Sequence, residues 1–338
     1  MSEIAAILGG ATACRERGER YALATVVSVR GSSYRRPGAR LLVPERTGPV
    51  GIISGGCLED EAARLARQAL QLEAPVLVTI DHSAEGDELW GLGLGCRGVV
   101  ELLAEPPDMA AETIAALERA QAGEPAYLLT GLDGDRRRLS ATEAESLGER
   151  AARAVAHGRP VLIGEAVLDP ILPPLHLVVC GAGPDAAPLV AAARRLGWRV
   201  DVADPRRSFL RPERFGDARL VDAAPEDAAE ATGAGEWTAV VVMSHDYLRD
   251  AAFVRGFLGR GVAYLGILGP RDRTERLLAE LPAPPSAADR AVVHAPAGLD
   301  IGADGPEQVA TAIVAEILAV LHGRGGGRLR EADGAIHG

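Results

Sequence analysis

The chain has 338 residues, 47% of them hydrophobic and 25% charged, and a formal net charge of −11. This length and balance predict a globular protein of two domains, each able to bury its own core. The negative charge argues against nucleic-acid binding, because that binding depends on Lys and Arg neutralising phosphates. No apolar stretch reaches the about 18 residues of a membrane span, and the start of the chain lacks the basic region of a secretory signal, so we expect a cytoplasmic protein with no membrane contact.

Four cysteines occur, and none of them forms a Cys-x-x-Cys pair. In a cytoplasmic protein they are not expected to form disulfides, and the ligand spacing of a structural metal site is missing. Cys14, on a predicted amphipathic helix, and Cys180, on a predicted strand, are expected to pack in the core.

Residues 1–108 have the pattern of a separate α+β domain. After the N-terminal helix, short apolar runs rich in β-branched residues predict strands. One helix interrupts them and carries acidic residues in its first turn, as the helix dipole favours. The expected strands are 21–29, 40–43, 49–53, 76–80 and 99–103, of which the first two form a hairpin, and the expected helix is 58–73.

Residues 109–172 are expected to connect this domain to the next. They contain predicted helices at 110–122 and 141–157 and predicted strands at 126–130 and 160–167. The proline-rich run Asp169–Pro174 predicts a stiff linker, and we place the domain boundary there. The tail, 324–338, has a Gly-Arg run with mixed charges and is predicted to be disordered.

Residues 173–323 alternate strands and helices. This pattern predicts an α/β domain with a Rossmann-like, doubly wound parallel sheet. The expected strands are 175–180, 199–203, 239–243, 263–268 and 291–294, and the expected helices are 185–196, 251–258, 273–281 and 307–322.

A glycine turn joins the first strand and the first helix of this domain. Gly181 and Gly183 take the first two positions of G-x-G-x-x-G/A, with Ala186 at the third. In such a turn the glycines let the backbone approach a pyrophosphate, which the N-terminus of the helix then binds. Asp204, about 20 residues further on, is placed to bind a ribose, and Arg206 lies just beyond it.

The same turn can also hold another phosphorylated ligand, or none. Asp185 lies where a phosphate would sit, and its charge would repel that phosphate. The alternative is that Asp185 is the N-cap or a first-turn residue of the helix. The turn predicts the fold and leaves its ligand open.

Two glycine–cysteine loops and one arginine-rich loop lie in the N-terminal domain. Cys57 precedes a helix, where a thiol has a lowered pKa, and Cys96 lies beside Arg97, which also favours a thiolate. The third loop supplies arginines and hydroxyls that suit a phosphate or another oxyanion. Alternatively, the two cysteines are packing residues and the arginine loop is a solvated turn. The candidate binding residues in these loops are Arg30, Ser32, Ser33, Arg36, Gly55, Gly56, Cys57 and Cys96.

Polar or glycine-rich loops follow three later strands of the C-terminal domain, at the edge where open parallel sheets bind ligands. His245 beside Asp246 suggests an acid–base pair, with a structural hydrogen-bonding role as the alternative. Gly269 and Arg271 follow the next strand and are expected to join the same edge. His245, Cys57 and Cys96 are thus the candidate catalytic side chains, and no metal ligand is predicted.

Taken together, these segments resemble the xanthine dehydrogenase accessory protein (XdhC/CoxI) family. The resemblance covers about residues 5–323, and several motifs in one order are more specific than any one alone. The segments that carry it are VVSVRGSSYRRPGARLLV, GIISGGCLEDE, GLGLGCRGVVELLAEP, VVCGAGPDAAPLVAAARRLGWRVDVADPR, VVVMSHDYLRDAAFV, YLGILGPRDRTERLLAEL and VHAPAGLDIGADGPEQVATAIVAEILAV.

The resemblance implies a carrier of molybdenum cofactor rather than an enzyme. Members of the family hold the cofactor while a partner cysteine desulfurase sulfurates it, and pass it to a xanthine-dehydrogenase-type molybdo-hydroxylase. A homodimer is also expected. The chain departs from the family at two places on the presumed ligand edge: it has Gly181-Ala182-Gly183-Pro184 where the family often has GAGH, and Gly269-Pro270-Arg271 where the family often has GSR.

Two other functions fit the same residues. The first is an NAD(P)-dependent oxidoreductase that uses the C-terminal domain, in which case Asp204 favours NAD over NADP. The second is a protein–protein adaptor that binds no cofactor.

Overall fold

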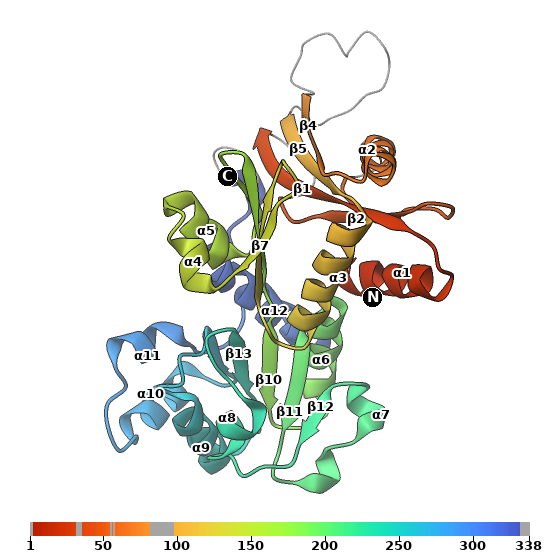
Figure 1. Ribbon diagram of the computed structural model, residues 1–338. Coiled ribbons are helices and arrows are strands. Elements are labelled where there is room, and N and C mark those ends of the chain that lie inside the picture. Colours follow the sequence, from red (N-terminus) through yellow and green to blue (C-terminus); the bar gives the residue numbers. More distant parts are fainter. Residues whose placement is uncertain (1–2, 32–35, 55, 57, 82–97, 332–338) are drawn as a thin grey trace. The chain divides into compact units, whose positions relative to one another are not determined.

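The computed structural model describes residues 3–31, 36–54, 56, 58–81 and 98–331 (Figure 1). The chain divides into two compact units, which we call the N-terminal unit, up to Pro173, and the C-terminal unit, Pro174–Glu331. Residues 109–172, expected to be a connecting region, belong to the N-terminal unit. Within the described ranges, no helix has both the length and the apolarity needed to cross a bilayer.

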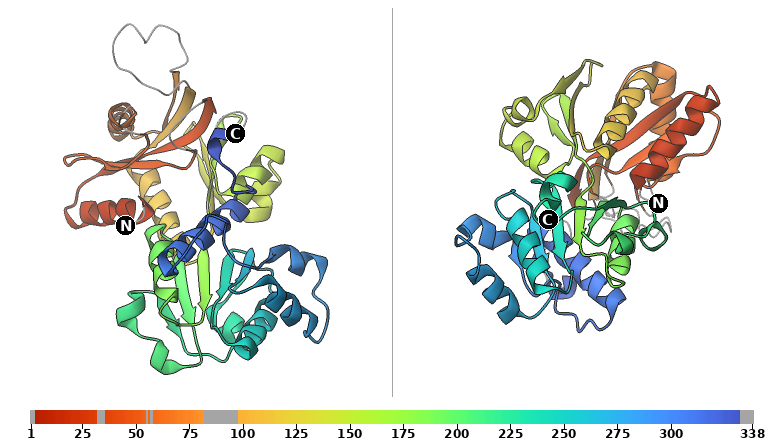
Figure 2. Two further views of the ribbon diagram at one scale, coloured as in Figure 1. Left: turned by 180° about the vertical axis from the view of Figure 1, so that it is seen from behind. Right: turned by 90° about the horizontal axis from the view of Figure 1, so that it is seen from below.

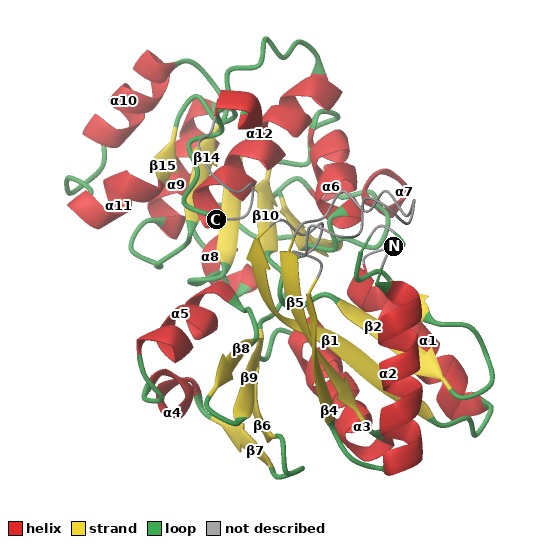
Figure 3. Ribbon diagram, turned by 90° about the horizontal axis from the view of Figure 1, so that it is seen from above, coloured by secondary structure: helices red, strands yellow, loops and turns green. Residues whose placement is uncertain are grey.

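The first sheet of the N-terminal unit has the order β3-β2-β1-β5-β4 and is antiparallel. Its strand β1 alternates: Ala22, Ala24 and Val26 face a cluster that includes α2, whereas Tyr21 and Leu23 face a cluster that includes α1 and α3. Figure 3 shows α2 lying along this sheet. The elements are α1 (Glu3–Glu16), β1 (Tyr21–Gly31), β2 (Arg40–Pro44), β3 (Val50–Gly51), α2 (Glu59–Leu72), β4 (Val76–Asp81), β5 (Gly98–Glu105) and α3 (Pro107–Gln121).

The second sheet of this unit has the order β7-β6-β9-β8, with α4 and α5 packed on it. A buried ion pair joins the two sheets, because Arg40 Nη2 on β2 donates to Asp169 Oδ2 on β9 at 2.5 Å. The elements are β6 (Ala126–Gly131), β7 (Arg136–Leu139), α4 (Ala141–Glu145), α5 (Glu149–His157), β8 (Val161–Ile163) and β9 (Ala166–Ile171).

Three expectations for this region were wrong. The helix expected at 141–157 is two helices, because the chain turns at Gly148, whose φ is 120°. The strand expected at 160–167 is the hairpin β8–β9, which turns at Gly164. The first three residues of the expected linker Asp169–Pro174 end strand β9; Pro170 is tolerated there because the pairing with β8 stops at Leu168 and leaves that side of β9 as an edge.

The C-terminal unit holds one parallel sheet of order β12-β11-β10-β13-β14-β15. Numbered within the unit this is 3-2-1-4-5-6, the order of dinucleotide-binding folds. Helices α6 and α12 pack on one face, and α8, α9 and α10 on the other (Figure 2). The Rossmann-like sheet predicted from the strand–helix alternation is therefore confirmed.

The strands of this unit are β10 (His176–Cys180), β11 (Arg199–Ala203), β12 (Arg219–Val221), β13 (Thr238–Val242), β14 (Tyr264–Ile267) and β15 (Val293–His294). The helices are α6 (Ala186–Arg195), α7 (Pro212–Phe215), α8 (Ala228–Thr232), α9 (Tyr247–Phe257), α10 (Arg271–Ala279), α11 (Ala287–Val292) and α12 (Pro306–Leu321). The strand expected at 291–294 is half helix, because a capping box of Ser286 and Asp289 starts α11 upstream. Of the tail expected to be disordered, the described part includes a 3-10 turn, Leu329–Glu331.

Candidate functional site

The three loops that carry the candidate residues of the N-terminal unit leave the same end of its first sheet. Gly31, at the end of β1, pairs with Gly98 at the start of β5, and Asp81, at the end of β4, pairs with Val99. Because β2 and β3 are antiparallel to their neighbours, β2 starts and β3 ends on the side that faces this end, with Arg40 opposite Thr25, six residues before Gly31. Figure 1 shows the ends of β1 and β4 beside the start of β5. Segments 32–39, 52–58 and 82–97 thus all begin on the side of the sheet that faces this end.

Only part of the predicted cofactor site falls on described residues. Arg30 lies exposed at the end of β1, and Arg36 is partly buried before β2. Gly56 is exposed, with a φ of 115°. The other candidates, Ser32, Ser33, Gly55, Cys57 and Cys96, lie outside the described residues.

Glu59, which the sequence analysis did not single out, organises the loop before α2. Its carboxylate accepts the backbone N–H groups of Ile53, Ser54 and Gly56, at 3.2, 2.8 and 3.0 Å, and the Ser54 hydroxyl at 2.5 Å. Burial raises the pKa of Glu59, but the hydrogen bonds from Ser54 and the backbone outweigh it and hold the pKa below its ordinary value. The N–H of Gly56, a candidate binding residue, is thus bound by a carboxylate of the chain itself.

Cys14 and Cys180 are core residues, as predicted. Both are 0% exposed. Burial, with Asp250 and Asp204 nearby, raises the pKa of the Cys180 thiol well above its ordinary value. Neither cysteine has the thiolate character that reactivity needs.

The glycine turn of the C-terminal unit lies between β10 and β13, where the strand order reverses direction. Gly181 has a φ of 116°, and a Cβ on it would lie 2.7 Å from the carbonyl oxygen of Met243. This first glycine is therefore required by the close approach of the end of β13. Asp250 fixes that end of β13, because its buried carboxylate accepts the N–H and the hydroxyl of Ser244 and pairs with Arg273 of α10.

Asp185 and His245 meet across this turn. The Nε2 atom of His245 lies 2.6 Å from Asp185 Oδ2, and the other carboxylate oxygen, Oδ1, lies 2.5 Å from the place a Cβ on Gly183 would take. Asp185 is in the N-cap position of α6 but makes no side-chain cap hydrogen bond. Asp246, the neighbour suggested as an acid–base partner for His245, instead caps α9 by accepting the N–H of Arg249 at 3.0 Å.

Asp204 is buried and hydrogen-bonded on both oxygens. Oδ2 accepts the N–H of Ala182 in the glycine turn at 2.8 Å, and Arg206 donates to Asp204 through its backbone N–H and its guanidinium. Burial raises the pKa of Asp204, but the hydrogen bonds from Arg206 and Ala182 outweigh it and lower the pKa. Arg206 also lies over the ring of Phe209, 3.9 Å from its centroid. A ribose would have to displace Arg206 to reach this carboxylate.

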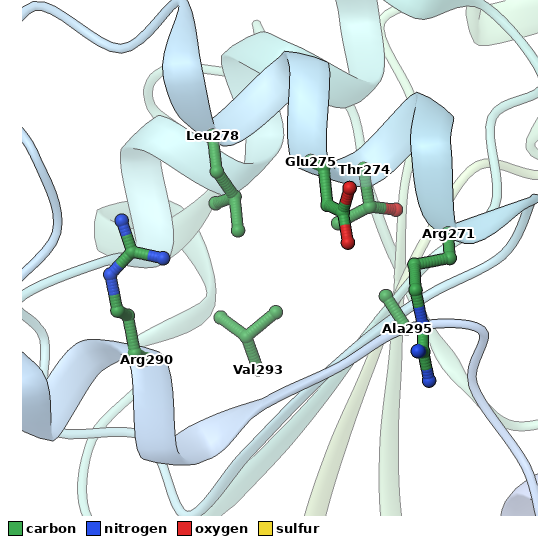
Figure 4. Close-up of a pocket in the computed structure, with 7 residues that line it drawn as sticks. All are labelled: Arg271, Thr274, Glu275, Leu278, Arg290, Val293 and Ala295. Carbon is green, nitrogen blue, oxygen red and sulfur yellow. The ribbon is translucent and has the colours of Figure 1, made fainter.

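Gly269 directly follows β14, the neighbour of β13, and lies at the same edge of the sheet as the glycine turn, because Leu268 N–H donates to the carbonyl of Val242. Arg271 begins α10 and lines a hollow of 220 Å³ formed with Thr274, Glu275, Leu278, Arg290, Val293 and Ala295. Figure 4 shows Arg271 and Arg290 on opposite sides of Val293. Asp185 and His245 are not among the residues that line this hollow.

Among the described residues, no three His, Cys, Asp or Glu side chains gather in a way that could hold a metal ion. The described residues instead form two glycine-bearing loop regions, one in each unit. An acidic side chain lies at each turn: Glu59 in the N-terminal unit and Asp185 in the C-terminal unit.

Comparison with known proteins decides the family. The model described as the XdhC Rossmann domain matches residues 177–317, and the XdhC and CoxI family model matches residues 14–81. A relative from Bacillus subtilis (strain 168), named as a probable xanthine dehydrogenase subunit, is 30% identical over 316 residues, which cover 89% of this chain and 93% of the relative. The chain belongs to the XdhC and CoxI family.

A solved structure supports the same assignment for this XdhC and CoxI family member. A crystal structure of a xanthine dehydrogenase from Bacillus halodurans matches with a TM-score of 0.76 at 27% identity and covers 98% of both chains. The matched family ranges contain Arg30, Cys57, Gly181 and His245, whereas Cys96 lies between the two ranges. The family predicted from the sequence motifs is confirmed.

Proposed function

We propose that this protein is an accessory protein of a xanthine-dehydrogenase-type molybdo-hydroxylase and that its N-terminal unit holds molybdenum cofactor before insertion. The observation that carries the proposal is the match over nearly the whole length of the Bacillus subtilis relative, whose name makes it a probable part of a xanthine dehydrogenase. A match to one unit alone would be compatible with a shared fold and a different function. Here both units match the same relative.

The loop end of the first sheet has groups suited to this cofactor. Its pyranopterin phosphate needs cationic and N–H partners, and exposed Arg30 supplies a cation there. When bound, the cofactor supplies a molybdenum centre held by dithiolene sulfurs, a soft group that thiolates suit. Cys57 and Cys96 belong to two of the three segments that start from this end of the sheet. Holding the cofactor, with its phosphate at the arginines and its sulfur-rich end at the thiols, is the role we assign to this unit.

The proposal includes partners. A cysteine desulfurase would sulfurate the cofactor while this protein holds it, and the apo-hydroxylase would then receive it. We expect this exchange to take place in the cytoplasm and the protein to act as a homodimer.

Retention of the cofactor through gel filtration tests the proposal. Molybdenum cofactor released without oxygen from a donor molybdo-enzyme is mixed with the full-length protein, and the cofactor that co-elutes is measured as its fluorescent oxidised pterin. We expect co-elution with wild-type protein and a loss of about tenfold or more with Cys57→Ala or Cys96→Ala. Cys180→Ala is the matched control, because its thiol is buried and should not affect retention.

Two outcomes would contradict this account in different ways. Absence of co-elution with wild-type protein would remove the carrier role altogether. Unchanged retention in both thiol variants would leave the carrier role and remove the thiols from it. Capture of the hydroxylase by cofactor-free protein, with no retention, would favour the adaptor alternative instead.

A further inference from the structure

We infer that Asp185 and His245 close the glycine turn of the Rossmann domain to dinucleotide phosphates, so that this domain does not use NAD(P). The inference does not depend on the proposed cofactor role, because it concerns a different unit and different ligands. It starts from a disagreement: the strand order is that of dinucleotide-binding folds, whereas the side chains at the turn do not fit the ligand.

The carboxylate of Asp185 takes the position that a pyrophosphate needs. In dinucleotide-binding turns the second glycine lacks a Cβ so that the pyrophosphate can approach the backbone. The second glycine here is Gly183, and Asp185 Oδ1 lies 2.5 Å from the place where its Cβ would be. The chain has therefore filled this space with an anionic group of its own.

His245 holds that carboxylate in place. Its Nε2 lies 2.6 Å from Asp185 Oδ2, although 60 residues separate the two in the chain. The backbone of His245 is in the left-handed region, with a φ of 58°, a costly conformation for a residue other than glycine. Its neighbours fix it there: Ser244 is bound to buried Asp250, and Asp246 caps α9. The backbone that carries His245 is thus fixed directly after β13, although the His245 side chain itself is 58% exposed.

The carboxylate that would bind the ribose is also occupied, by groups of the chain itself. The acidic residue that would bind the ribose, Asp204, is 1% exposed and is bonded to Ala182 and Arg206. A dinucleotide would therefore meet a like charge at its pyrophosphate and an occupied acceptor at its ribose. Like charges placed together across an interface weaken binding strongly, by about 100-fold or more.

Titration of the full-length protein with NADH, followed by fluorescence, and with ADP, followed by calorimetry, tests the inference. Wild-type protein should show no saturable binding at millimolar ligand. Asp185→Ala, which uncovers Gly183, should bind both ligands at least about tenfold more tightly than wild type. Asp185→Asn, which keeps the size and removes the charge, should also gain affinity.

Two further variants separate charge from general disturbance. His245→Ala frees the Asp185 carboxylate from its partner but keeps the negative charge, so it should gain affinity less than Asp185→Asn does. Asp227→Ala is the matched control: Asp227 is likewise the N-cap of a helix, α8, with no side-chain cap hydrogen bond. It should gain nothing.

Circular dichroism and melting temperature establish that each variant is folded. If Asp185→Ala does not fold, Asp185→Asn carries the test. Micromolar binding of NADH by the wild-type protein would overturn the inference, and so would folded Asp185 variants that bind no better than wild type.

Discussion

Two acidic side chains, Glu59 and Asp185, have parallel roles in the two units. Each lies at a glycine turn that precedes a helix: Glu59 accepts the N–H of Gly56, and Asp185 Oδ1 lies where a Cβ on Gly183 would be. Glu59 accepts three backbone N–H groups, whereas Asp185 pairs with His245 and covers Gly183. The charge and the available hydrogen-bond donors of each turn therefore depend on one carboxylate as well as on the glycines.

Glu59 predicts how the N-terminal unit responds to acid. Because its pKa is below the ordinary value of about 4.3, its contribution to stability is present at neutral pH and is lost as the pH falls through the lowered pKa. Glu59→Gln should lower the free energy of unfolding by about 1–3 kcal/mol at pH 7 and flatten the loss of stability on acidification. Urea unfolding followed by circular dichroism at several pH values measures both effects.

Glu61→Gln is the control for that experiment. Glu61 lies on the same helix, α2, but is paired with Arg64 on the surface. Its loss should cost less than about 1 kcal/mol. Equal effects of the two substitutions would contradict the role given to Glu59.

At the scale of elements, the two glycines of the C-terminal turn should respond differently to alanine. Gly181 has a φ of 116°, and its Cβ would meet the backbone of Met243 and Ser244, which directly follow β13 and are held by Asp250. Gly183 lacks a positive φ, and its Cβ would meet only the side chain of Asp185. Gly181→Ala should therefore cost about 2–4 kcal/mol, and Gly183→Ala much less. Chemical unfolding of both variants measures this, and equal costs would contradict the packing described.

Hydrophobic periodicity made most elements predictable. Strands β10 and β13 are largely apolar runs, β11 alternates charged with apolar residues, and α2 has acidic residues at its start, so these elements were predicted from pattern alone. Strand β7, with the sequence RRRL, carries three arginines and little apolar signal, and its pairing with β6 decides its structure. Strand β12 was missed because it is only three residues long.

The loops of the candidate site were predictable from the sequence, but the side chains that pair within it were not. The glycine turn and the loops after the strands follow from residue type and position, so Gly181 and His245 were found. The pairing of His245 with Asp185 could not be predicted, because it depends on β10 and β13 being neighbours in the sheet, which no local pattern shows. The role of Glu59 was missed because a glutamate in the first turn of a helix is also what the helix dipole favours.

At the scale of the whole molecule, we assign a different role to each of the two units. The loop end of the N-terminal unit is assigned to molybdenum cofactor, and the Rossmann turn of the C-terminal unit is assigned a structure closed to dinucleotides. The family match spans both units.

Side-by-side equilibrium dialysis of wild-type protein against molybdenum cofactor and against NADH tests this division most directly. The account predicts saturable binding of the cofactor at a fixed ratio to the chain, no binding of NADH at millimolar concentration, and no competition between the two. Tight binding of NADH together with failure to take up the cofactor would contradict it.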